Sequence, residues 1–100
     1  AGVYQAPGQW SQLPADAVVV DVRTPAEFDS GHVDSAVNID VESSGFADQI
    51  AGLDPSVPYV VYCRSGNRSA VAASQMAAAG LAVIDAGGLP DVAAAGAPGM

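Results

Sequence analysis

The chain has 100 residues, half of them apolar and 14% charged, with eleven acidic residues against three arginines and no lysine. This composition is typical of one globular domain and excludes a disordered chain. The formal net charge of −8 argues against nucleic acid or an anionic membrane as a partner. The only cysteine, Cys63, excludes an internal disulfide, a zinc site built from several cysteines and CxxC redox chemistry.

The first predicted elements are a strand and a short helix. The β-branched run "DAVVVDV", residues 16–22, predicts a strand buried on both faces. The stretch "TPAEFDSG" follows at once, with Thr24 suited to the N-cap and Pro25 to the first helical position. Glu27 completes a capping box and Gly31 fits the C-terminal cap, so a helix of about two turns is expected.

A second strand and a second helix come next. The stretch "SAVNID", residues 35–40, is a strand candidate. In "GFADQIAGL", the side chains Phe46, Ile50 and Leu53 recur at helical spacing, which predicts an amphipathic helix. The apolar run "VPYVVYC", residues 57–63, is the strongest strand pattern in the chain.

The remaining pattern completes an alternation of strands and helices. Residues 67–80 are alanine-rich and end in a glycine, which predicts a helix. Residues 81–88 predict a strand and turn, and the tail after them a short helix. Alternation of this kind indicates βαβ units in a mainly parallel sheet with helices on both faces. Ligands of such sheets bind at the carboxyl ends of the strands, where Cys63 is expected.

The loop after the strongest strand, "CRSGNRS", concentrates the scarce positive charge beside the only thiol. Gly66 permits a tight turn with positive φ, which would direct backbone N–H groups inward toward an anion. The dipole of the following helix contributes about 0.3–1 kcal/mol to binding an anion at its N-terminus. Together with Arg64 and Arg68, these effects should lower the pKa of Cys63. A purely structural, buried cysteine is the alternative.

No metal, cofactor or general base is evident. His32 is the only histidine and is expected to be a hydrogen-bonding loop residue. The acidic residues are scattered without the spacing of metal ligands. No signal peptide is visible, so a cytoplasmic location is expected, with export left open because the sequence begins at Ala1.

Two stretches together resemble the rhodanese family. "DVRTPAEFDSGHVDSAVNI", residues 21–39, resembles its first signature, and "VVYCRSGNRSAVAASQMAAAGLAVIDAGG", residues 60–88, resembles its second half. The resemblance implies a single rhodanese-like domain over residues 1–100, an α/β three-layer sandwich with a mainly parallel five-stranded sheet and helices on both faces. One departure is that many members carry a tryptophan soon after the G-G, whereas the only tryptophan here is Trp10.

The resemblance also implies sulfur transfer through a persulfide. Cys63 matches the nucleophile, and Arg68 matches a loop arginine suited to orient an anionic donor such as thiosulfate. The residues matching the loop that cradles the persulfide are Arg64, Ser65, Gly66, Asn67, Arg68 and Ser69; those expected to brace the fold near the site are Asp21, Arg23, Glu27 and His32. The implied partners are a small sulfur donor and a thiol or cyanide acceptor, and a monomer is expected.

Two alternatives share this fold. Protein phosphatases and arsenate reductases typically use a C-x5-R loop that is wide enough for a tetrahedral oxyanion. Cys63 and Arg68 form a C-x4-R loop, which suits one extra sulfur and favours sulfurtransferase. The other alternative is a module that carries persulfide sulfur to a partner protein.

Overall fold

The computed structural model describes residues 2–99, and within them it contains five strands, four helices and one 3-10 helix. The strands are β1 (Gly2–Gln5), β2 (Val18–Asp21), β3 (Val37–Asn38), β4 (Tyr59–Tyr62) and β5 (Ala82–Asp85). The helices are α1 (Pro25–Asp29), α2 (Phe46–Ala51), α3 (Asn67–Ala78) and α4 (Leu89–Ala94), and the 3-10 helix η1 is Trp10–Gln12.

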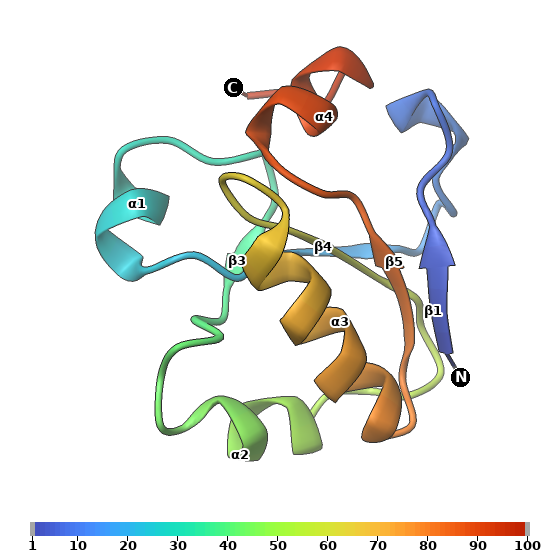
Figure 1. Ribbon diagram of the computed structural model, residues 1–100. Helices are drawn as coiled ribbons and strands as arrows, with labels where there is room; N and C mark the ends of the chain where they lie inside the picture. The colour runs from blue at the N-terminus through green and yellow to red at the C-terminus, as the bar shows by residue number, and fades with distance from the viewer. Residues whose placement is uncertain (1, 100) are drawn as a thin grey trace.

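The strands form one parallel sheet in the order β1-β5-β4-β2-β3. Asp21 at the end of β2 pairs with Tyr62 at the end of β4, and Val61 pairs with Asp85 at the end of β5. The carboxyl ends of the central strands therefore lie at one edge of the sheet, and Cys63 follows directly after β4. Figure 1 shows the loop after β4 between α1 and α4. The predicted α/β fold with a parallel five-stranded sheet is confirmed.

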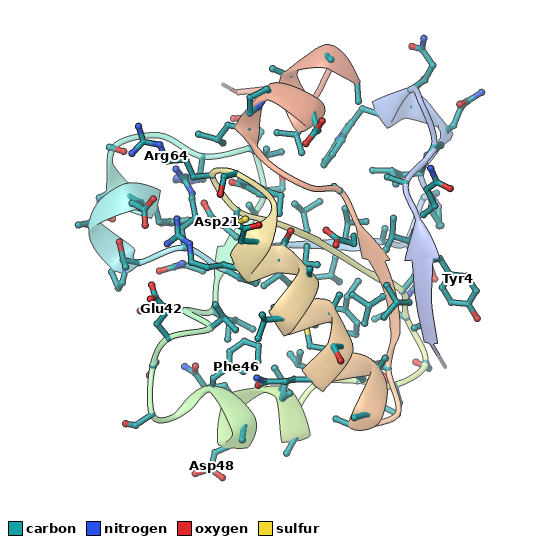
Figure 2. All side chains as sticks on the ribbon, viewed as in Figure 1. Tyr4, Asp21, Glu42, Phe46, Asp48 and Arg64 are labelled. Atoms are coloured by element: carbon teal, nitrogen blue, oxygen red, sulfur yellow. The ribbon has the colours of Figure 1, made fainter. Side chains whose placement is uncertain are left out.

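Side chains of β4 alternate between two apolar clusters, one on each face of the sheet. Tyr59, Val61 and Cys63 belong to the first cluster, while Val60 and Tyr62 belong to the second. The first cluster is completed by buried residues of α2 and α3, namely Phe46, Ile50, Ala72, Ala73 and Met76. The second includes Val92 of α4 and, packed against it, Phe28 of α1 and Trp10 of η1. Figure 2 shows Phe46 reaching from α2 toward α3.

The elements at the two sheet edges differ from the sequence prediction. The candidate strand over residues 35–40 shrinks to the two residues of β3, because Ser35 has a positive φ of 69° and Asp40 begins a turn. The strand β1 was not predicted. It lies at the other edge of the sheet, and Val3 and Tyr4 are about half exposed, so no apolar pattern marks it.

Trp10 packs against the C-terminal helix, although it lies far upstream in sequence. Its backbone N–H donates to the carbonyl of Ala95 at 2.7 Å, and its side chain shares a cluster with Val92. An aromatic side chain from the N-terminal segment thus packs beside α4.

Candidate active site

The loop from β4 to α3 turns at Gly66, the N-cap of α3, which has a φ of 100°. This is the positive φ that the sequence predicts, and a side chain there would be strained. The turn directs the Gly66 N–H onto Sγ of Cys63 at 2.9 Å. The backbone N–H of Cys63 donates to the carbonyl of Gly87 at 3.0 Å, so the loop is anchored to the segment after β5.

Gly88 lets that segment pack directly on the loop. A Cβ at Gly88 would lie 2.6 Å from the carbonyl oxygen of Arg64 and 2.9 Å from Cα of Ser65. The adjacent N–H of Leu89 donates to the same Arg64 carbonyl at 2.9 Å. The second glycine of the G-G pair is therefore required by a close approach between two backbones.

Cys63 has no exposed surface, and its pKa is lowered from the ordinary value. Burial is the largest single effect and raises the pKa, but it is outweighed by hydrogen bonding from the N–H and hydroxyl of Ser69 and from the amides of Gly66 and Ser65. The Ser69 hydroxyl also lies 3.1 Å from the Gly66 carbonyl. The single hydroxyl proton can be donated either to this carbonyl or to Sγ of Cys63. A thiolate is the stronger acceptor of the two. The loop therefore favours a thiolate.

The main groups that lower the pKa of Cys63 are backbone amides and one hydroxyl. The prediction from the sequence also included the charges of Arg64 and Arg68. Ser69 was expected only as part of the loop. Its side chain is fully buried on the first turn of α3, and its position one turn after Gly66 is the signal that would have identified its hydroxyl as a donor to the sulfur.

Arg68 is engaged by carboxylates. Its Nη1 lies 2.6 Å from Oε1 of Glu27, its Nη2 lies 3.0 Å from Oε2, and Glu42 lies 3.6 Å from Nη1. The hydrogen bonds from Arg68 are the largest cause that lowers the pKa of Glu27 to about 2. Glu27 also closes the predicted capping box with Thr24, which is confirmed. An anionic donor could occupy this guanidinium only in competition with Glu27.

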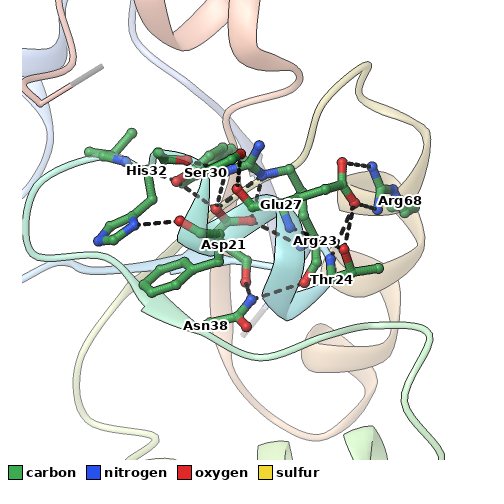
Figure 3. Close-up of polar contacts among 12 residues, drawn as sticks. Asp21, Arg23, Thr24, Glu27, Ser30, His32, Asn38 and Arg68 are labelled. Carbon is green, nitrogen blue, oxygen red and sulfur yellow. Dashed lines mark hydrogen bonds and ion pairs between the residues drawn. The ribbon is translucent and has the colours of Figure 1, made fainter.

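A buried ion pair supports the base of the loop. The guanidinium of Arg23 donates to both carboxylate oxygens of fully buried Asp21, at 2.7–3.1 Å, and to the carbonyl of Gly31 at 2.7 Å. Tyr62, the neighbour of Cys63, donates its hydroxyl to Asp21 at 2.9 Å and accepts from the N–H of Val33 at 3.0 Å. Figure 3 shows Asp21 and Arg23 between His32 and the Glu27–Arg68 pair.

Tyr62 was predicted only as an apolar strand residue. Burial is the largest cause that raises its pKa, to about 12, so the phenol stays neutral and acts as a hydrogen-bond donor. The sequence around Tyr62 predicts this role only weakly. A tyrosine in a buried strand needs a hydrogen-bond partner for its hydroxyl, but the neighbouring residues do not identify that partner.

His32 contacts the end of α1. Its Nδ1 donates to the carbonyl of Phe28 at 2.8 Å, and its ring stacks on Phe28 with 3.6 Å between centroids. This contact is of the kind expected of a hydrogen-bonding loop residue. His32 also lines a cleft of about 220 Å³ with Arg23, Ser30, Gly31 and Leu89, between the end of α1 and the start of α4.

The described residues contain no other evident chemical centre. No three histidine, cysteine or carboxylate side chains within residues 2–99 are grouped so that they could hold a metal ion. None of the helices in this part of the chain is long and apolar enough to cross a membrane. The chemistry available at the site is therefore that of a buried cysteine whose pKa is lowered by the amides and the hydroxyl around it, at the N-terminus of a helix.

The fold is an α/β domain with a parallel sheet, and its only cysteine lies in the loop at the carboxyl edge of that sheet. The family model of the rhodanese-like domain matches residues 7–95, and the chain belongs to that family. Over 70 residues the chain is 44% identical to the thiosulfate sulfurtransferase GlpE of Pseudomonas aeruginosa. The aligned stretch is 69% of this chain and 62% of that protein. Curated relatives of this name are matched over about three fifths of their length, 58% and 62% in two cases.

Solved structures give the same assignment. A rhodanese-related protein from Thermoplasma volcanium superposes with a TM-score of 0.73 at 31% identity, covering 85% of this chain and 84% of that one. A structure described as rhodanese with anions from E. coli superposes with a TM-score of 0.69 at 29% identity, covering 84% of this chain and 96% of that one.

Proposed function

We propose that the rhodanese-like domain described here is a sulfurtransferase domain, in which Cys63 carries the transferred sulfur as a persulfide. The observation that carries this proposal is the short C-x4-R loop in which the Gly66 N–H donates to Sγ of Cys63 at 2.9 Å and the Cys63 pKa is lowered. The names of the curated relatives, thiosulfate sulfurtransferases, support the same activity. The anions named for the E. coli rhodanese support an anionic donor.

The reaction proceeds in two displacements at sulfur. The Cys63 thiolate attacks the outer sulfur of thiosulfate, the S–S bond breaks, and sulfite leaves with the bonding electron pair. A thiolate or cyanide acceptor then attacks the outer sulfur of the persulfide, and the Cys63 thiolate leaves. The amides that favour the thiolate also stabilise the anionic persulfide. Because Cys63 has no exposed surface, the atoms that cover the sulfur must move before a donor contacts it.

Mass spectrometry tests the covalent intermediate. Protein incubated with thiosulfate alone should gain the mass of one sulfur atom on the peptide that contains Cys63, and cyanide should remove it. With one thiol in the chain, no internal disulfide can replace this species, so ping-pong kinetics are expected. Cys63→Ser should keep the fold, as judged by circular dichroism, and lose the transfer. An active enzyme with unchanged mass and with kinetics that require both substrates bound together would contradict the proposal.

Hydrolysis of phosphate esters is not expected. The loop is one residue shorter than C-x5-R, and the guanidinium that would hold a phosphate is bound by Glu27 at 2.6 and 3.0 Å. Turnover of an aryl phosphate that disappears in Cys63→Ser would favour the phosphatase alternative. A carrier module would form the persulfide but release sulfur only to a partner protein. The monomeric state and the cytoplasmic location stay predictions.

A further inference from the structure

A cavity of about 380 Å³ lies between α4 and the segment that follows β1. The two segments are joined beside it, because the N–H of Trp10 donates to the carbonyl of Ala95 at 2.7 Å. Figure 1 shows the segment after β1 beside α4. The volume falls within the range of about 300–1,000 Å³ that is typical of small-molecule sites. Cys63 does not line this cavity, so it is separate from the site of the proposed sulfur transfer.

The cavity lies at the carboxyl ends of two neighbouring strands. Gln5 ends β1 and pairs in register with Asp85, which ends β5, and both residues line the cavity. Ligands of parallel sheets bind outside the carboxyl ends of the strands. The turn after β5 contacts both this cavity and the cysteine loop, since Gly87 lines the cavity and its carbonyl accepts the N–H of Cys63 at 3.0 Å.

One part of the cavity wall is apolar. Trp10 and Leu13 line it from the N-terminal segment, and Val92 lines it from α4. Trp10 and Leu13 also pack against the apolar cluster that contains Val92. Such a wall lets the hydrocarbon part of a ligand leave water, and the face of an indole ring attracts cations more strongly than other aromatic side chains do.

The other part of the wall carries negative charge. One oxygen of Asp85 accepts the N–H of Gly87 at 3.0 Å, and one oxygen of Asp91 accepts the N–H of Gly88 at 2.9 Å. None of the ion pairs within residues 2–99 involves either carboxylate. An ionised carboxylate has about four acceptor sites, so each of the two can accept further hydrogen bonds from a ligand.

We propose that this cavity binds a small organic cation with an apolar body, such as a primary alkylamine. The ammonium group lies at Asp85 and Asp91, and the hydrocarbon part lies against Trp10. The two carboxylates repel an anion, and the net charge of −8 draws cations to the surface. No third carboxylate, histidine or thiol within residues 2–99 joins them to form a metal-binding group, whereas one ammonium group has three N–H donors to share between two carboxylates.

Tryptophan fluorescence tests the proposal without any turnover, because the only tryptophan of the chain lines the cavity. Wild-type protein is titrated at low ionic strength with cyclohexylmethylammonium, neutral cyclohexylmethanol and anionic cyclohexanecarboxylate, which share one apolar body and do not absorb where tryptophan is excited. The cation should give a saturable change in Trp10 emission and bind about tenfold more tightly than the alcohol, the effect of one charge-assisted hydrogen bond. Equal affinities for cation and alcohol, or no saturable response to the cation, would overturn the proposal.

Two substitutions locate the ammonium group. Asp85→Asn and Asp91→Asn each keep an oxygen that can accept the backbone N–H, and each should weaken binding of the cation about tenfold and leave binding of the alcohol unchanged. Asp48→Asn on α2 removes the same charge outside the cavity and should leave the affinity for the cation unchanged. Equal weakening by all three substitutions would show that the net charge alone attracts the cation, and the proposal would be wrong. Circular dichroism checks the fold of each variant, and the comparison of the three probes on wild-type protein decides the proposal if a variant does not fold.

Discussion

Arg68 and Glu27 are 41 residues apart in sequence and form a two-pronged ion pair that joins the first turn of α3 to α1 (Figure 3). An arginine in the first turn of a helix is opposed by the helix dipole, whereas a carboxylate there is favoured. The carboxylate of Glu27 therefore offsets the charge of Arg68 at the N-terminus of α3 while it caps α1. The pair fixes the loop that holds Cys63 relative to α1.

The first prediction concerns stability and pH. Glu27→Gln keeps a residue that can close the capping box and removes the charge, so it should lower the free energy of unfolding by up to about 1 kcal/mol at neutral pH, as for a partly exposed pair. The folded-state pKa of Glu27 is about 2, below the ordinary value of about 4.3. The stabilisation is therefore present above about pH 4.3 and lost as the pH falls toward about 2.

Urea unfolding across this pH range measures the effect. The difference in unfolding free energy between wild type and Glu27→Gln should shrink as the pH falls from neutral toward about 2. Asp48→Asn, at an exposed position of α2, is a control that changes the same kind of charge outside the pair. A Glu27→Gln difference that stays constant over the whole range would mean that the ion pair does not stabilise the fold.

The second prediction concerns the thiol. Ser69→Ala removes the hydroxyl that favours the thiolate and retains the backbone N–H, so the pKa of Cys63 should rise. Titration of the thiolate absorbance against pH measures it. Ser65→Ala is the matched control. Ser65 is exposed and lowers the pKa of Cys63 through its backbone amide, which the substitution keeps. Identical titration curves for wild type and Ser69→Ala would show that the hydroxyl stays on the Gly66 carbonyl.

The third prediction concerns the turn after β5. Gly88→Ala should destabilise the protein by about 1–3 kcal/mol, as overpacking does, and reduce persulfide formation, because its Cβ would lie 2.6 Å from the Arg64 carbonyl oxygen. Gly8→Ala meets no atom within 4 Å and should change neither property. Thermal unfolding and the thiosulfate mass shift measure both variants. A Gly88→Ala protein with normal stability and normal persulfide yield would exclude a tight backbone contact at this point.

The fourth prediction concerns the buried network under the loop. Tyr62→Phe leaves the N–H of Val33 and one oxygen of Asp21 without a hydroxyl partner, which should lower the free energy of unfolding by about 1–3 kcal/mol. Tyr4→Phe is the control, because Tyr4 is 52% exposed and surface changes usually stay within about 0.5 kcal/mol. Denaturant unfolding compares them. Equal effects of the two substitutions would argue that water replaces the Tyr62 hydroxyl in the folded state.

Local patterns in the sequence were enough to predict the fold class and the centre of the site. The buried strand before Cys63, the capping box of Thr24 and Glu27, and the positive φ of Gly66 depend on neighbouring residues. Side-chain periodicity, caps and glycine turns act over a few residues, so a single sequence contains them. The prediction of the two strands at the edges of the sheet was less accurate, since β1 is mostly exposed and β3 has only two residues.

The partners of the polar side chains depend on contacts between segments distant in sequence. Arg68 could have served a donor, yet its guanidinium is bound by Glu27, and the Tyr62 hydroxyl meets Asp21 from a strand 41 residues away. Trp10 reaches α4 from the other end of the chain. Charge and hydroxyl groups can pair with any complementary group brought near them, and no local pattern specifies which one. Only the packing of α1 beside the first turn of α3 determines that Arg68 is paired with Glu27, while Arg64, next to Cys63, stays exposed.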